Sequence, residues 1–270
     1  MDSRDNGPAM TKHRTLAARP RITQDWKPMR ASSDAGMALE VAGTRVPVFL
    51  RVNPRARRLI LRVAQGTREV VVVAPSKREL KDALAFAERQ RPWIAARLAE
   101  QAPPVEFAPG AEIPILGRRH TIEHRPFARA GAWIEESGDL RLCVSGGQAH
   151  VARRTEDFLK RLARAHLAER THEHCARLGV APPKLSIRDP ATRWGSCSPA
   201  SGISFSWRLV LAPPRVLDYV AAHEAAHLVH MNHSKAFWRL LATLVPDVRG
   251  PVRWLATDGR DLHRYGRSDA

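Results

Sequence analysis

The chain has 270 residues, of which 44% are hydrophobic, and its formal net charge is +17. This length allows one large domain or two small ones with an ample core. No apolar run approaches the roughly 20 residues that span a bilayer, and residues 1–30 hold no apolar stretch like that of a secretory signal. The three cysteines, Cys143, Cys175 and Cys197, are too widely spaced for a disulfide framework. We therefore expect a cytoplasmic protein with no membrane association.

The positive charge comes from 44 Lys and Arg against 27 Asp and Glu. Such an excess favours anionic partners, for example a nucleotide or a nucleic acid. The alternative is a solvated basic surface that follows from a general preference for Arg over Lys. Charge bears on association rather than on fold or chemistry, so both interpretations stay open.

Short strand-like segments dominate the first half of the sequence. Residues 1–36 carry no periodic pattern, and we predict a disordered leader there. From Leu39 onward the apolar residues follow strand patterns. The predicted strands cover residues 45–50, 58–63, 69–74, 113–116, 120–124, 133–135 and 140–144. The turn residues Gln65-Gly66-Thr67 predict a hairpin between the second and third of these strands.

Helix signals interrupt and then follow these strands. Ser76 and Glu79 have the spacing of a capping box that opens a helix. Pro92 is suited to the first position of a second short helix, which runs to residue 101. A long helix is predicted over residues 152–178, where Gly179 ends it.

The last third of the sequence contains the remaining elements. Strands are predicted at 185–187 and 203–211, and Pro213-Pro214 precede a helix. Ser234 is the expected cap of a helix over residues 235–244, and a last short helix is expected over residues 252–262. These patterns divide the chain into a leader (1–36), a β-rich part with one helical segment (37–150), a helical unit (151–265) and a tail (266–270).

The most informative motif is His223-Glu224-Ala225-Ala226-His227. Residues four apart share one face of a helix, so His223 and His227 can hold one metal ion between them. Glu224 lies beside the place of the attacking water and can take its proton. The motif predicts a catalytic zinc site, and a surface helix with incidental histidines is the alternative.

Two histidines are candidates for a third ligand. His230 lies two turns after His223, on the order of 10 Å along the helix axis at a rise of about 1.5 Å per residue, which suits a shared ion poorly. His233 follows Asn232, a residue at which a helix can end, so the chain can fold back toward the metal. We favour His233 on this geometry. Three protein ligands then leave the fourth zinc position for water.

Polar and aromatic residues upstream of the motif are candidates for substrate binding. Arg193, Trp194 and Arg208 could clamp an anionic or peptide substrate, although a structural tryptophan and solvated arginines are the alternatives. Residues 202–209 alternate as in a half-exposed strand. Such a strand beside a zinc helix could pair with an extended peptide, or it could be an ordinary core strand.

Three further features are interpreted as structural. Cys197 has no paired base at nearby spacing, so we expect an inert, at least partly buried thiol. The segment 172–175 contains two histidines, which point apart at a spacing of two, and we place it on the surface. Asp247 is interpreted as a turn residue at a helix end, with orientation of a metal-ligating histidine as the alternative.

Four segments stand out together: Arg193–Ser198, Trp207–Leu209, Tyr219–Leu228 and Asn232–Trp238. They resemble the YgjP-like metallopeptidase family, which is related to the SprT-like and WLM zinc proteases. The resemblance implies an α+β fold, in which a β-rich N-terminal part precedes a mainly helical, zincin-like unit that carries the motif on a helix. It also implies zinc bound by His223, His227 and His233, with Glu224 as the catalytic base.

The favoured function is therefore a zinc-dependent hydrolase, in particular a metallopeptidase with a peptide or protein substrate. One alternative is a metal-dependent nucleoside triphosphate pyrophosphohydrolase, in which arginines would hold the phosphates. Another is a basic nucleic-acid-associated protein or a protease recruited to DNA.

Overall fold

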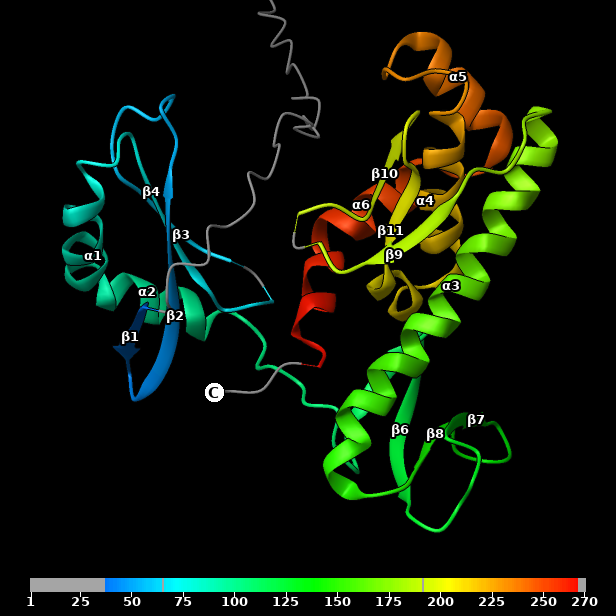
Figure 1. Cartoon of the computed structure of the whole chain (residues 1–270), viewed down its shortest axis with the longest axis horizontal. Coiled ribbons are helices and arrows are strands. Elements are labelled where there is room, and N and C mark those ends of the chain that lie inside the picture. The colour runs from blue at the N-terminus through cyan, green and yellow to red at the C-terminus, as the bar shows by residue number, and fades with distance from the viewer. Residues whose placement is uncertain (1–36, 65, 191, 267–270) are drawn as a thin grey trace, which may run out of the picture. The chain divides into compact units, whose positions relative to one another are not determined.

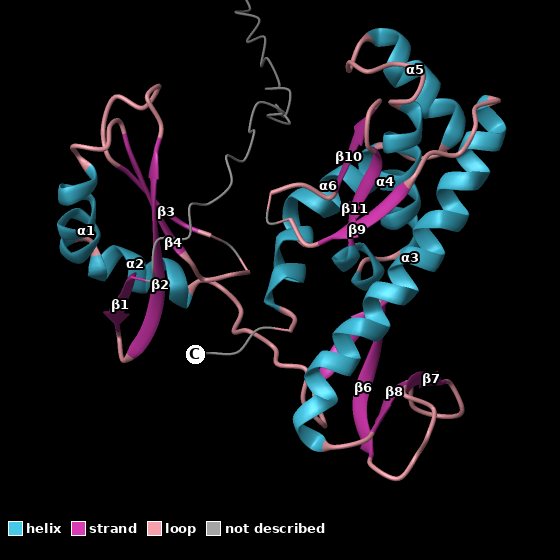
Figure 2. Cartoon of the chain, viewed as in Figure 1, coloured by secondary structure: helices cyan, strands magenta, loops and turns pink. Residues whose placement is uncertain are grey.

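The computed structural model describes residues 37–64, 66–190 and 192–266 (Figures 1 and 2). The predicted leader, most of the predicted tail and Gln65 of the predicted turn lie outside the described residues. In the described part of the chain, no helix has both the length and the apolar character needed to cross a bilayer.

The first four strands form one mixed sheet. They are β1 (Met37–Val41), β2 (Thr44–Val52), β3 (Ile60–Val63) and β4 (Val70–Ala74), in the order β1-β2-β4-β3. The β3 and β4 strands pair antiparallel, which confirms the predicted hairpin, whereas β2 and β4 are parallel. Helices α1 (Leu80–Arg89) and α2 (Arg91–Ala99) cover one face of the sheet, and together they enclose a hydrophobic cluster.

The start of α1 differs from the prediction. Ser76 Oγ does bond to Glu79 Oε1 at 3.0 Å, but α1 begins only at Leu80, and Glu79 is the residue before it. The capping-box pattern therefore closes a turn ahead of the helix. The prediction for α2 is confirmed, because Pro92 lies in its first turn.

A second sheet follows, formed by β5 (Glu112–Ile115), β6 (Arg118–Arg125), β7 (Ala132–Glu135) and β8 (Arg141–Ser145), in the order β5-β6-β8-β7. After the 3-10 turn η1 (Gln148–His150) comes α3 (Val151–Leu178). It ends, as predicted, at Gly179, whose φ of +68° is the left-handed conformation that glycine adopts readily.

The third sheet has three strands in the order β10-β11-β9. They are β9 (Leu185–Arg188), β10 (Gly195–Ser198) and β11 (Gly202–Ser206). The predicted strand 203–211 was too long, since the chain forms the 3-10 helix η2 (Trp207–Leu211) after Ser206. All five side chains of η2 are buried, which an alternating strand on a one-sided sheet does not allow.

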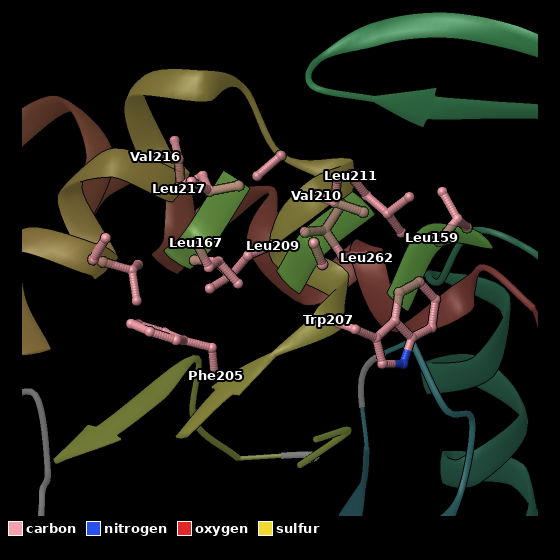
Figure 3. Packing of buried hydrophobic residues seen from close by; sticks show 14 of the residues in the cluster. Leu159, Leu167, Phe205, Trp207, Leu209, Val210, Leu211, Val216, Leu217 and Leu262 are labelled. Atoms are coloured by element: carbon pink, nitrogen blue, oxygen red, sulfur yellow. The ribbon is translucent and has the colours of Figure 1, made fainter. Parts of the chain in front are cut away.

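The largest hydrophobic cluster joins this sheet to the helices. Trp207 and Phe205 are among its largest fully buried side chains, and Figure 3 shows them beside leucines of η2 and α3. The cluster includes residues from 107 to 262, and therefore from both the second sheet and the C-terminal helices. This packing holds β10 and β11 against the helix over residues 214–226, which contains His223 and Glu224.

The C-terminal helices are α4 (Pro214–Ala226), α5 (Lys235–Leu244) and α6 (Arg249–Thr257), followed by the 3-10 helix η3 (Gly259–Arg264). Ser234 caps α5 as predicted, because its Oγ accepts the N–H of Phe237 at 3.3 Å. The predicted last helix is displaced, since α6 begins at Arg249 and η3 continues the segment. The β-rich N-terminal region and the helical C-terminal region together confirm an α+β fold.

Candidate metal centre

Three histidines from one short stretch of chain converge. His223 lies in the last turn of α4, His227 is the residue that ends this helix, and His233 comes just before α5. One ring nitrogen from each lies within 4.8 Å of the others, and the Nε2 atoms of His223 and His233 are 3.0 Å apart. This is the one group of three potential metal ligands in the described part of the chain, and it contains His233 rather than His230.

The chain reaches this arrangement because α4 ends early. The helix stops at Ala226, and the N–H groups of Leu228 and Val229 bond to Ala225 and Ala226 in tighter turns. The chain then folds back, and Ser234 begins α5. The buried ring of Phe237, in the first turn of α5, lies 4.6 to 5.0 Å from the three imidazole centroids and packs beneath them.

Hydrogen bonds select which ring nitrogen faces the cluster. His227 donates from Nδ1 to the carbonyl oxygen of His230 at 3.0 Å, so its Nε2 keeps a free lone pair. Tyr219, one helical turn before His223, has its hydroxyl 3.4 Å from Nδ1 of His223. Both contacts involve Nδ1, and a contact at the nitrogen that does not bind the metal fixes the orientation of a metal-ligating imidazole.

The electrostatic environment keeps the three imidazoles neutral. Burial, and then the neighbouring His227 and His233, lowers the pKa of His223 to about 3. Burial also lowers the pKa values of His227 and His233. A neutral imidazole is the form that binds a metal ion, so this donor set fits a divalent cation.

Glu224 is the acidic group beside this cluster. Glu224 is only 6% exposed. Burial raises the pKa of its carboxyl group to about 8, and the positive charge of Arg193 partly offsets this rise. The carboxyl group lies against Gly195 of β10, where a Cβ atom would stand 2.6 Å from Oε1 of Glu224. A divalent cation next to it would favour the ionised form.

The three predicted substrate-binding residues lie in different settings. Arg193 is exposed and acts electrostatically on Glu224. Trp194 is partly buried and stacks on His263, with ring centroids 5.2 Å apart.

Arg208 is buried and held by several acceptors. Its guanidinium donates to both carboxylate oxygens of Asp189, at 2.7 and 3.0 Å, and to the carbonyl oxygens of Leu262 and Tyr265. It also lies over the Trp207 ring at 4.5 Å. These contacts tie β9 and the C-terminal segment to η2.

The strand next to the site is β10 rather than β11. The predicted strand 202–209 was considered for pairing with a peptide, but β11 is the central strand and is paired on both sides. The sheet has two edge strands, β9 and β10, and β10 was not predicted from the sequence. Cys197 of β10 is partly buried as expected, and burial, and then Glu224, raises the pKa of its thiol to about 11, which disfavours the reactive thiolate.

Two other expectations are also resolved. His172 is exposed as predicted, but the surface prediction was wrong for His174, which is buried and bonds to Asp218 at 2.8 Å. Asp218 comes from α4, 44 residues later in the chain, so local spacing could not reveal it. Asp247 is the predicted turn residue, since its Oδ1 accepts the N–H groups of Arg249 and Gly250 at the start of α6.

Two residues of the site were missed. Tyr219 is four residues before His223 and so shares its helix face, a spacing that could have identified it. Gly195 could not have been found from spacing, because its contact with Glu224 depends on how β10 packs against α4.

A neutral three-histidine cluster beside a buried carboxylate, on an α+β fold, is the arrangement of a metal-dependent hydrolase. Comparison with known families agrees, since the YgjP-like metallopeptidase domain matches residues 57–258. The chain belongs to this family, and the resemblance seen in the sequence is confirmed. Searches of the curated proteins and of the solved structures gave no match.

Proposed function

We propose that this protein is a zinc-dependent metallopeptidase in which His223, His227 and His233 hold the metal and Glu224 is the general base. The observation that carries the proposal is the convergence of three neutral imidazole nitrogens within 4.8 Å, with Glu224 next to the first of them. Zinc is favoured because it accepts three nitrogen ligands and keeps a fourth position for water or substrate. When bound, it supplies Lewis acidity toward a carbonyl and lowers the pKa of water.

Glu224 moves the proton in this proposal. A carboxylate oxygen takes a proton from the attacking water and then delivers it to the amine that leaves the cleaved peptide bond. Its buried position against Gly195 excludes competing solvent and limits the directions in which the carboxylate can face. Tyr219 and the carbonyl of His230 keep the imidazoles oriented.

The edge of β10 is the proposed peptide-binding strand. The bond from the N–H of Ser206 to the carbonyl of Trp194, at 2.8 Å, sets the parity of the β10–β11 pair. The backbone N–H and C=O groups of Trp194, Ser196 and Ser198 therefore point toward β11. Those of the intervening Gly195 and Cys197 point to the unpaired edge of β10. An extended substrate that pairs there would pass beside Glu224.

The exposed Arg193 is the proposed contact for an acidic or polar group of the substrate, since it lies close enough to influence Glu224. Trp194 and Arg208, which were predicted for the same role, are proposed to act as positioning residues. Their contacts with His263 and Asp189 hold the ends of β9 and β10 in place.

The test combines metal analysis with turnover. Wild-type protein, His233→Ala and Glu224→Gln are purified after growth with zinc, and metal content is measured by elemental analysis. Hydrolysis is measured with a quenched fluorogenic peptide library. We expect about one zinc per chain in the wild type and in Glu224→Gln, loss of zinc in His233→Ala, and turnover only in the wild type.

Other outcomes would redirect or end the proposal. Turnover retained by Glu224→Gln would refute the role of this carboxylate. Zinc retained by His233→Ala would refute the three-histidine site. Pyrophosphate release from nucleoside triphosphates with added Mg²⁺, without peptide cleavage, would favour the pyrophosphohydrolase alternative instead.

A further inference from the structure

The first described region carries a large share of the positive charge for its length. Residues 37–101 contain 13 Lys and Arg and 6 Asp and Glu, which is +7 of the total of +17. The next segment, residues 102–150, contains 5 Lys and Arg and 6 Asp and Glu, which is −1. Residues 151–270 carry +8 over 120 residues, so the 65 residues of the first sheet and its two helices are the more densely basic part of the described chain.

The helices cover one face of this sheet and leave the other, the open face, uncovered at Phe49, although Val73 of β4, on that second face beside Arg51, is only 4% exposed. Val46 and Val48 of β2 are buried under α1 and α2. The alternate residues Arg45, Pro47 and Phe49 are exposed on the other face. Phe49 is 39% exposed, although burial in the hydrophobic cluster would have been the favourable place for a phenylalanine.

The strand register places arginines around this ring. Phe49 is paired with Val71 of β4, and Val71 is paired with Arg62 of β3. Phe49 and Arg62 therefore lie in one row of the open face, about 10 Å apart at two strand spacings. Arg51 lies two residues further along β2 and so on the same face.

The loop after β2 adds three more cations. Arg55, Arg57 and Arg58 are exposed, and no ion pair within the described residues joins them or Arg62 to an acidic group. Two acidic residues belong to this face by register: Glu40, paired with Arg45 at the far end of β2, and Glu69, which immediately precedes β4 beside Pro47. From Phe49 toward the loop after β2, the charged residues of this face and loop are the arginines at 51, 55, 57, 58 and 62.

We propose that the open face of the β1-β2-β4-β3 sheet binds single-stranded nucleic acid, with Phe49 as a stacking platform and the arginines at 51, 55, 57, 58 and 62 along the phosphates. An exposed aromatic ring beside arginines on a sheet offers stacking to an unpaired base and charge to its backbone. An acidic protein would use the charge but would not need the flat exposed ring. A duplex keeps its bases stacked on each other and would not use the ring either.

The test is fluorescence anisotropy of the full-length protein with fluorescein-labelled single strands of dT20 and rU20 and a 20-base-pair duplex. We expect at least one of the two single strands to bind more tightly than the duplex. Phe49→Ala should weaken binding on the order of tenfold or more, and Phe49→Leu should weaken it similarly, because leucine keeps apolar volume without a flat ring. Phe49→Trp should retain binding.

Salt dependence separates this face from general charge. The triple variant Arg55→Ala/Arg57→Ala/Arg58→Ala should lower the slope of log affinity against log salt by about 2, at roughly 0.7 per phosphate contact. The matched control Arg161→Ala/Arg249→Ala/Arg253→Ala removes the same charge from exposed positions on α3 and α6 and should leave the slope unchanged. Circular dichroism checks that each variant is folded.

Several results would overturn the proposal. Equal losses in the two triple variants would mean that net charge alone drives binding. Wild-type affinity in Phe49→Ala or Phe49→Leu would show that Phe49 does not stack on a base. Binding to vesicles of phosphatidylserine and phosphatidylcholine without binding to either single strand would assign the face to a lipid surface. None of these measurements requires a bound metal, so the outcome does not depend on the proposed peptidase.

Discussion

Gly195 offers the sharpest test of the position assigned to Glu224. The residue lies in β10, and its φ is outside the left-handed range that only glycine adopts easily, so alanine suits the backbone. The space does not suit alanine, because a Cβ would stand 2.6 Å from Oε1, 2.7 Å from Cγ and 2.8 Å from Cδ of Glu224. Gly195→Ala therefore acts on the carboxylate through sterics alone.

The expected displacement follows from these distances. Ordinary contacts of a Cβ atom begin at 3.4 Å, so Oε1 must withdraw by about 0.8 Å. A misplacement of about 1 Å in a catalytic group can cost on the order of 100-fold in rate. We expect kcat/KM for peptide hydrolysis to fall roughly 10- to 100-fold, with zinc content unchanged because the three histidines are not touched.

A matched control is Gly147→Ala. Gly147 has a φ of −65°, and the nearest atom to its Cβ would be Cδ2 of His150 at 3.8 Å, an ordinary contact. We expect wild-type kcat/KM in this variant. If Gly195→Ala also hydrolysed peptides at the wild-type rate with full zinc content, the reasoning would be refuted, since Glu224 would then not act from the position seen here.

Three further substitutions have expected outcomes. Tyr219→Phe removes the hydroxyl behind His223 and should weaken zinc affinity roughly 10-fold, the low end for such contacts because the bond is 3.4 Å long, as measured by competition with a chelator. Arg208→Lys loses the paired hydrogen bonds to Asp189. It should lower the free energy of unfolding by about 2–3 kcal/mol in denaturant titrations and leave KM unchanged. A raised KM with unchanged stability would instead support direct contact between Arg208 and the substrate. Ser234→Ala removes the cap of α5 and should cost about 1 kcal/mol in the same titration, and no loss would show that the cap is dispensable.

Elements with strong local signals were predictable from the sequence. The cap and length of α5 match because Ser234 acts within its own first turn. The end of α3 matches because Gly179 alone adopts the left-handed conformation there. The β3–β4 hairpin matches because two apolar runs flank a short turn. In each case the deciding interaction lies within a few residues.

Elements that depend on distant partners were not predictable. The Gly-Ser-Cys-Ser sequence of β10 has little strand propensity, and it becomes a strand by pairing with β11. The boundary between β11 and η2 could not be predicted, because residues 203–211 are apolar enough to suit either a strand or a buried 3-10 helix. His174 was assigned to the surface because its partner Asp218 comes from another helix.

The same distinction separates the two halves of the candidate site. The three histidines lie within 11 residues, and helix periodicity together with one early helix end brings them together, so the sequence already indicates the ligand set. The surroundings of Glu224 come from a different strand, and only packing of β10 on α4 decides that a glycine must face the carboxyl group. Metal binding therefore tests mainly local structure, whereas the rate of hydrolysis tests the tertiary fold. For this reason Gly195→Ala and His233→Ala are expected to fail in different ways, the first in turnover and the second in zinc content.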